Sequence, residues 1–127
     1  MQNKLDYSFD DELVSKFCYD IDNKHIEVHY TGFYNSQSED TLLDQKCALI
    51  IENWKDAKSK IGDQEKYYEL NKHIGIFRMI YYMKLIDSNL EMFVNTIDNR
   101  YVTLVFIEPT INFIVQKNKI KLLNTVR

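Results

Sequence analysis

Residues 90–107 read LEMFVNTIDNRYVTLVFI, and this stretch decides the fold class of the chain. Apolar and polar side chains alternate on both sides of residues 98–100, a short polar run of the kind that forms tight turns. The pattern predicts two antiparallel strands, at residues 90–97 and 101–107, joined as a hairpin. Pro109 is expected to end the second strand, because proline has no backbone N–H to donate to a neighbouring strand.

The same period of two recurs elsewhere and predicts further strands. It is present at residues 13–21, 26–31, 74–86 and 111–115. The segment at 74–86 is long enough for a helix, but its Ile and Tyr content favours a strand. Residues 47–54 form a near-continuous apolar run, typical of a buried strand, and we expect Trp54 at its end to lie in the core.

Two polar segments interrupt these strands. Residues 36–44 are predicted to form a loop with one helical turn. Residues 55–73 are predicted to hold a loop around residues 62–63 and a short helix near residues 64–71. A last edge strand with a basic surface is expected at residues 119–126.

These elements predict a mainly β fold in a single domain that covers residues 1–127. We expect an antiparallel sandwich or partly open barrel of about six to eight strands, with one or two short helices. An alternating strand–helix architecture is excluded, because no long helical pattern recurs between the strands.

Charge is unevenly distributed along the chain. Residues 1–63 carry 13 acidic and 7 basic side chains, a net charge of −6, whereas residues 64–127 carry 6 acidic and 9 basic ones, a net charge of +3. The acidic half argues against nucleic acid as the partner, because phosphate contacts need clustered Lys and Arg. Since the chain has neither a secretory signal nor an apolar run of ~18 residues, we expect a cytoplasmic protein that does not enter a membrane.

No motif of the chain is typical of an enzyme. The three glycines are isolated, which excludes a glycine-rich phosphate loop, and no serine lies in a Gly-x-Ser-x-Gly sequence. Cys18 and Cys47 fit no zinc or redox spacing, so we expect two reduced thiols. The sequence therefore predicts a protein without catalytic activity and without a cofactor.

His25, Glu27 and His29 form the sharpest site-like pattern. They lie two residues apart on one predicted strand and therefore share a face, where two imidazoles and a carboxylate could hold a metal ion. The same face is the polar side of an amphipathic strand, whose other side carries Ile26 and Val28. A solvated face explains the row without a ligand, so we predict no stoichiometric zinc and keep metal binding as the alternative.

Acidic and aromatic residues of the N-terminal half suit a surface for a protein partner. The predicted partner-binding residues are Asp10, Asp11, Phe33, Tyr34, Glu39, Asp40 and Asp44. The carboxylates would steer a basic partner toward this surface and fix its register. The aromatic pair, next to Gly32 in a predicted bend, would supply most of the affinity.

Three stretches of the first half resemble a family of small bacterial proteins. They are Phe9-Asp10-Asp11 before the first strand, Gly32-Phe33-Tyr34 after the paired strands, and the strand at residues 47–54. The arrangement resembles the small β-rich immunity proteins of polymorphic toxin systems, and the hairpin at residues 90–107 agrees with it loosely. The resemblance implies a protein that binds and neutralises a cognate toxin, with a basic toxin domain as its partner. It assigns no functional residue.

A second hypothesis belongs to a different class. A β barrel with a site among inward-facing aromatic side chains would bind a small molecule or act on one. The residues that would line such a site are Tyr30, Phe77, Tyr81 and Phe106.

Overall fold

The computed structural model describes residues 2–3, 7–8, 13–31, 33–35, 41–43, 46–62 and 64–115. Within them the chain is mainly β and its strands pair antiparallel, which confirms the predicted fold class. Eight of these strands have five or more residues, and helix α1 (Leu70–His73) has four. No helix in the described part of the chain has the length and apolar composition to cross a membrane.

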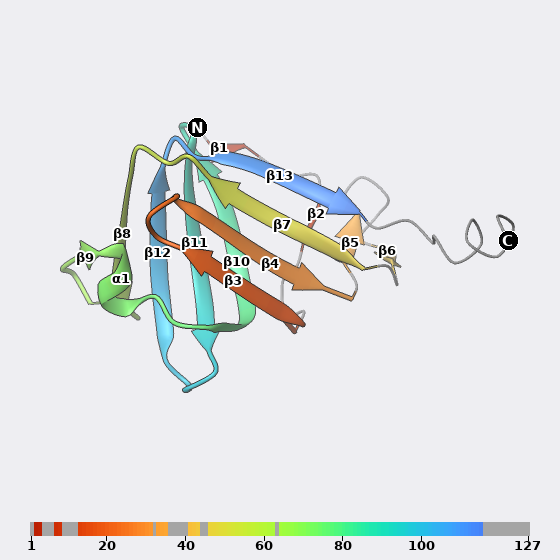
Figure 1. Cartoon of the computed structure of the whole chain (residues 1–127), viewed down its shortest axis with the longest axis horizontal. Coiled ribbons are helices and arrows are strands. Elements are labelled where there is room, and N and C mark those ends of the chain that lie inside the picture. The colour runs from red at the N-terminus through yellow and green to blue at the C-terminus, as the bar shows by residue number, and fades with distance from the viewer. Residues whose placement is uncertain are drawn as a thin grey trace, which may run out of the picture.

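Two larger sheets and one smaller sheet make up the fold (Figure 1). The six-stranded sheet has the order β1 (Gln2–Asn3), β10 (Phe77–Ile86), β11 (Asn89–Thr96), β12 (Tyr101–Ile107), β8 (Asp56–Ile61), β9 (Tyr68–Glu69). The four-stranded sheet has the order β13 (Thr110–Val115), β7 (Cys47–Glu52), β4 (His25–Tyr30), β3 (Lys16–Asp20). The three-stranded sheet has the order β2 (Tyr7–Ser8), β5 (Phe33–Asn35), β6 (Thr41–Leu43). The strands of the four-stranded sheet run across those of the six-stranded sheet, and the two form the layers of a sandwich (Figure 1).

The hairpin predicted from residues 90–107 lies at the centre of the six-stranded sheet. β11 and β12 pair with Leu90 opposite Phe106 and Val94 opposite Val102. All four side chains are fully buried, because the alternation places them on the face that meets the other layer.

The two larger sheets are joined at a corner where neighbouring segments bend together. β7 continues into β8, and β12 continues into β13, while β7 pairs with β13 and β8 pairs with β12. Asn53 and Glu108 turn the chain at this corner with φ angles of 56° and 49°. The Lys55 N–H donates to the carbonyl of Ile107 at 2.9 Å. Such corners let paired strands serve two sheets that pack across each other.

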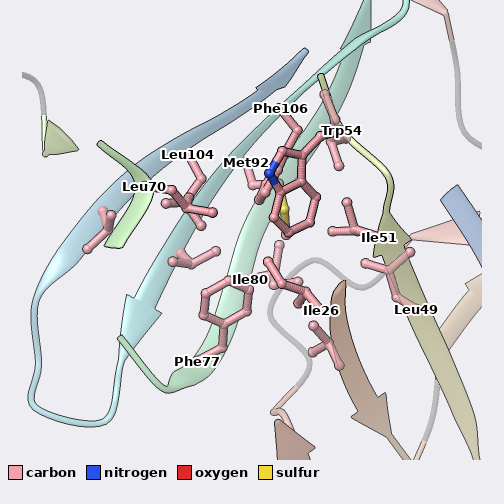
Figure 2. Close-up of a cluster of buried hydrophobic side chains, with 14 of the residues drawn as sticks. Ile26, Leu49, Ile51, Trp54, Leu70, Phe77, Ile80, Met92, Leu104 and Phe106 are labelled. Atoms are coloured by element: carbon pink, nitrogen blue, oxygen red, sulfur yellow. The ribbon is translucent and has the colours of Figure 1, made fainter. Parts of the chain in front are cut away.

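The hydrophobic core fills the space between these two sheets (Figure 2). Side chains from both layers meet there, among them Ile26, Leu49, Ile51, Ile80, Met92 and Leu104. Trp54 lies at the corner and is 5% exposed, with its ring 5.0 Å from that of Phe106. The expectation that Trp54 belongs to the core is therefore confirmed.

β10 is a strand, as its Ile and Tyr content predicts, but its faces do not follow simple alternation. Its pairing with β11 shifts between Phe77 and Met79 and again between Ile80 and Tyr82. Phe77 and Ile80 are both buried, although strict alternation places them on opposite faces. Each extra residue in the strand reverses the alternation, which is the usual effect of a β-bulge.

The polar segments differ most from the predictions. Residues 56–61 form β8, a strand that the sequence does not predict, because β12 supplies a pairing partner that local sequence does not reveal. The short helix begins at Leu70, not near residue 64, since β9 pairs with β8 just before it. The predicted loop at 36–44 contains β6, which pairs with β5. The predicted edge strand at 119–126 lies outside the described residues.

Candidate functional site

The two aromatic residues of the predicted contact lie on the central strand of the three-stranded sheet. β5 carries Phe33 and Tyr34 and pairs with β2 on one side and β6 on the other. Tyr34 lies opposite Ser8 in β2 and opposite Leu42 in β6. The distant strand β2 and the neighbouring strand β6 therefore both pair with the strand that carries this aromatic pair.

The acidic residues of the predicted contact lie outside the described residues; they are Asp10, Asp11, Glu39, Asp40 and Asp44. In the sequence they are close to the ends of the outer strands of the three-stranded sheet. Asp10 comes two residues after β2 ends, Asp40 directly precedes β6, and Asp44 directly follows it. Their chain neighbours are thus brought together by the pairing of β2, β5 and β6.

A row of ionisable side chains crosses the outer face of the four-stranded sheet. His25, Glu27 and His29 alternate with buried residues on β4, and Glu52 of β7 lies opposite His25. Nδ1 of His25 lies 3.1 Å from a carboxylate oxygen of Glu52, and its Nε2 lies 2.8 Å from Oε2 of Glu27. Nε2 of His29 lies 3.1 Å from Oε1 of Glu27. Both ring nitrogens of His25 thus face carboxylates, which only accept hydrogen bonds, and this arrangement favours the imidazolium form.

The pKa shifts in this cluster have the same origin. The hydrogen bond to Glu27 and then the one to Glu52 raise the pKa of His25. The hydrogen bonds from His25 and then His29 lower the pKa of Glu27. Among the residues that the structure describes, no group of three or more His, Cys, Asp or Glu is placed to hold a metal ion. The row that resembled a metal site is an ion-pair network here, and the absence of stoichiometric zinc stays a prediction.

The raised pKa of His25 makes a pH-dependent contribution to stability. This contribution is fully present below the unfolded pKa of ~6.5 and is lost as the pH rises through the folded pKa. Substituting His25→Gln should therefore cost more stability at pH 6 than at pH 8, by ~1 kcal/mol or less because these side chains are partly exposed. Urea denaturation at the two pH values measures the difference without adding salt.

His73 provides a control of opposite sign. Burial, and then the charges of Lys72 and Arg100, lower the pKa of His73. Its neutral form is the one that the fold favours, so the cost of His73→Gln should be larger at pH 8 than at pH 6. If His25→Gln costs the same at both pH values, the network does not hold a protonated His25.

A hollow of about 1020 Å³ opens beside the ion-pair network. Glu27 and His29 border it, together with the apolar residues Ala48, Ile50 and Ile114. Ile114 is 53% exposed, so part of this apolar lining faces solvent. The hollow offers both apolar contact area and ion pairing to a ligand or partner.

The aromatic residues of the small-molecule hypothesis do not form one site. Tyr30, Phe77 and Phe106 are 1%, 2% and 0% exposed and belong to the packed core. Tyr81 lies on the outer face of the six-stranded sheet, where its ring contacts those of Phe93 and Tyr101 at 5.9 and 5.8 Å between centroids. An inward-facing site made of these four residues is therefore not present.

Sequence reasoning missed the aromatic outer face of the six-stranded sheet. Strict alternation in β10 puts Tyr81 and Tyr82 on opposite faces, but both rings contact Phe93, whose neighbours Met92 and Val94 point into the core. The bulge between Ile80 and Tyr82 is the reason. The signal available in the sequence was the presence of Tyr81 and Tyr82 in β10 and of Phe93 in β11, two segments that were each predicted to be strands.

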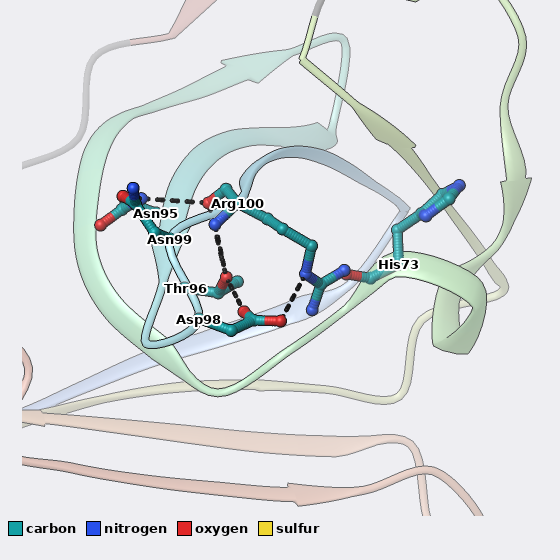
Figure 3. A network of polar contacts seen from close by, with 6 residues as sticks. All are labelled: His73, Asn95, Thr96, Asp98, Asn99 and Arg100. Atoms are coloured by element: carbon teal, nitrogen blue, oxygen red, sulfur yellow. Dashed lines mark hydrogen bonds and ion pairs between the residues drawn. The ribbon is translucent and has the colours of Figure 1, made fainter.

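A polar network fastens the β11–β12 turn to helix α1 (Figure 3). The Arg100 guanidinium donates to the carbonyl of His73 at 2.9 Å and to Asp98 at 2.9 Å. The Thr96 hydroxyl donates to Asp98 and accepts from the Arg100 N–H at 3.1 Å. The hydrogen bonds from Thr96 and then Arg100 lower the pKa of Asp98. The network ties the turn to the helix and acts as a structural clamp.

The chain was compared with protein-family models, curated proteins and solved structures, and no match was found in any of the three.

Proposed function

We propose that this protein acts in the cytoplasm as an immunity-type protein, which binds and neutralises a cognate toxin by protein–protein contact. One observation carries the proposal: β5, with Phe33 and Tyr34, pairs on both sides with strands whose sequence neighbours are acidic. Backbone pairing on both sides holds the strand that carries the aromatic pair. Aromatic residues often dominate the affinity of protein interfaces.

The charge distribution supports a basic toxin domain as partner. The N-terminal half has a net charge of −6, and the acidic residues next to β2 and β6 in sequence belong to it. Carboxylates around an interface raise the rate of encounter with a basic protein, and this effect weakens with salt. The aromatic residues would then slow dissociation. The charges are therefore expected to affect the association rate, and the aromatic residues the dissociation rate.

The proposal is tested with a toxin domain encoded next to the gene for this protein. Co-expression should restore growth that the toxin alone arrests. With the purified pair, Tyr34→Ala should speed dissociation about 30-fold, the equivalent of ~2 kcal/mol for an interface hot spot. Neutralising Glu39, Asp40 and Asp44 together should instead slow association and flatten its salt dependence.

The matched control removes three charges elsewhere. Neutralising Lys117, Lys119 and Lys121 should leave both rate constants within twofold, or speed association slightly. Failure of co-expression to protect against the toxin would refute the function. Unchanged binding by the Tyr34 and acidic variants, with loss of binding in the lysine variant, would place the contact on the basic half of the chain.

A further inference from the structure

A second hollow, of about 510 Å³, lies on the outer face of the six-stranded sheet. The residues that line it come from β8, β10, β11, β12 and the segment after β8: Lys60, Gly62, Tyr67, Tyr82, Glu91, Phe93 and Thr103. Its volume falls within the ~300–1,000 Å³ typical of small-molecule sites. It combines aromatic rings, one ammonium group and one carboxylate, which is the composition of a site for a polar aromatic ligand.

The aromatic part of this hollow is held by the sheet. Tyr82 and Phe93 are paired neighbours in β10 and β11, and their rings stack with centroids 5.7 Å apart and planes 17° apart. On the opposite side, the Thr103 hydroxyl donates to the carbonyl of Gly62 at 3.1 Å. A Cβ on Gly62 would meet no atom within 4 Å, so the space above this residue is open. A planar ring that stacks on the Tyr82–Phe93 pair would share the Tyr82 ring with the Lys84 ammonium, which lies 4.6 Å from the ring centre.

The cationic part lies next to Tyr67. The ammonium groups of Lys58 and Lys60 are 4.6 and 4.7 Å from the centre of the Tyr67 ring. Within the described residues, neither ammonium forms an ion pair with a carboxylate. Lys60 lines the hollow and Lys58 lies at the same ring, so their positive charge favours an anionic ligand beside Tyr67. A phosphate monoester, with a charge of about −1.5 to −2 at neutral pH, matches two lysines better than a singly charged carboxylate does.

The acidic part is the Glu91 carboxylate. The Tyr82 hydroxyl donates to Oε2 of Glu91 at 3.0 Å and so orients it. Burial, and then this hydrogen bond, raise the pKa of Tyr82 to about 12, which keeps the phenol neutral and able to donate. A carboxylate offers about four acceptor positions, so Glu91 retains capacity for N–H donors of a ligand. Guanine presents two such donors, N1–H and the N2 amino group, side by side on one edge.

We propose that this hollow binds a nucleoside monophosphate, with its base stacked on Tyr82 and Phe93, its phosphate held by Lys58 and Lys60, and a guanine edge donating to Glu91. This site is separate from β2, β5 and β6, and its occupancy does not depend on toxin binding. Stacking would supply affinity and Glu91 selectivity, because the two neighbouring N–H donors of guanine match a carboxylate, whereas adenine presents one amino donor beside an acceptor nitrogen.

Isothermal titration of the full chain with GMP, AMP and guanosine tests this assignment. GMP should bind saturably at one site, and more tightly than AMP. Lys60→Met should weaken GMP binding about tenfold through loss of a charge-assisted contact, while guanosine binding stays the same. Glu91→Gln should reduce the preference for GMP over AMP, because the amide turns one acceptor into a donor.

Lys72→Met is the matched control. The Lys72 ammonium also lies over a tyrosine ring, 5.8 Å from the centre of the Tyr68 ring, but neither Lys72 nor Tyr68 lines the hollow. GMP affinity within twofold of wild type in this variant supports a defined phosphate site. Equal losses in the Lys60 and Lys72 variants, or no saturable GMP binding, would overturn the proposal. Affinity that grows with each nucleotide added to an oligonucleotide would also overturn it, because the aromatic outer face of the six-stranded sheet, rather than the hollow, would then be the site.

Discussion

Replacing Trp54 by Ala is expected to lower the free energy of unfolding by about 3–5 kcal/mol. Trp54 is 5% exposed and lies at the corner where β7 passes into β8. Its ring contacts Phe106 of β12, so it packs against the second segment that bends at the same corner (Figure 2). Its removal leaves a cavity that both sheets border, and the paired strands on either side prevent the corner from collapsing to fill it. Equilibrium urea denaturation followed by circular dichroism measures the loss.

Ile97→Ala is the control for this experiment. Ile97 is 61% exposed in the turn that follows β11 and should change stability by no more than ~0.5 kcal/mol. A Trp54→Ala variant that loses less than ~1 kcal/mol would contradict the corner packing, because surface substitutions produce effects of that size.

The second large effect is expected at the contact between β3 and β10. The rings of Phe17 and Phe77 lie 4.4 Å apart between centroids, and Phe77 is 2% exposed. Each ring belongs to a different layer, so the pair joins the sheets away from the corner. Phe77→Ala should cost about 3–5 kcal/mol through the lost burial and the cavity it leaves. Phe17→Ala should lower the free energy of unfolding by less, because Phe17 is only partly buried.

A double-mutant cycle separates this contact from burial in general. The Phe17→Ala/Phe77→Ala variant should lose less stability than the sum of the single variants, by about 0.5–1.5 kcal/mol for an aromatic pair. Phe77→Ala combined with Trp54→Ala is the additive reference, since the two rings have different ring contacts: Trp54 contacts Phe106, and Phe77 contacts Phe17. Additivity of Phe17 with Phe77 would mean that the two rings do not stabilise each other.

Both aromatic contacts matter for the outer faces of the two layers, which carry the ion-pair network and the proposed ligand site. The network of His25, Glu27 and Glu52 lies on one outer face, and the hollow that contains Tyr82 and Phe93 lies on the other. Core packing keeps each sheet in a single register, so these side chains hold their positions before any ligand binds. Sites on such rigid elements are more exact than sites on loops.

Local sequence was sufficient to predict a strand wherever that strand is amphipathic. β12 begins at Tyr101 and ends at Ile107, as the alternation predicts, and Pro109 falls in the gap before β13. The alternation of β4 was equally readable, because side chains that point to opposite faces of a strand differ in polarity. The same reading placed His25, Glu27 and His29 on one face but could not show that they bind each other.

Tertiary structure alone decided the rest. β8 has the polar sequence DAKSKI, and it is a strand because β12 pairs with it; its small residues Ala57 and Ser59 pair with inward-facing positions of β12. The bulges of β10 turn Tyr81 and Tyr82 to the same face and so create the aromatic surface that neither strand's pattern predicts. Alternation depends on neighbours in the chain, whereas strand pairing and bulges depend on contacts between residues far apart in it. The sequence by itself therefore determined the fold class, and only the pairing of distant strands determined which side chains share a surface.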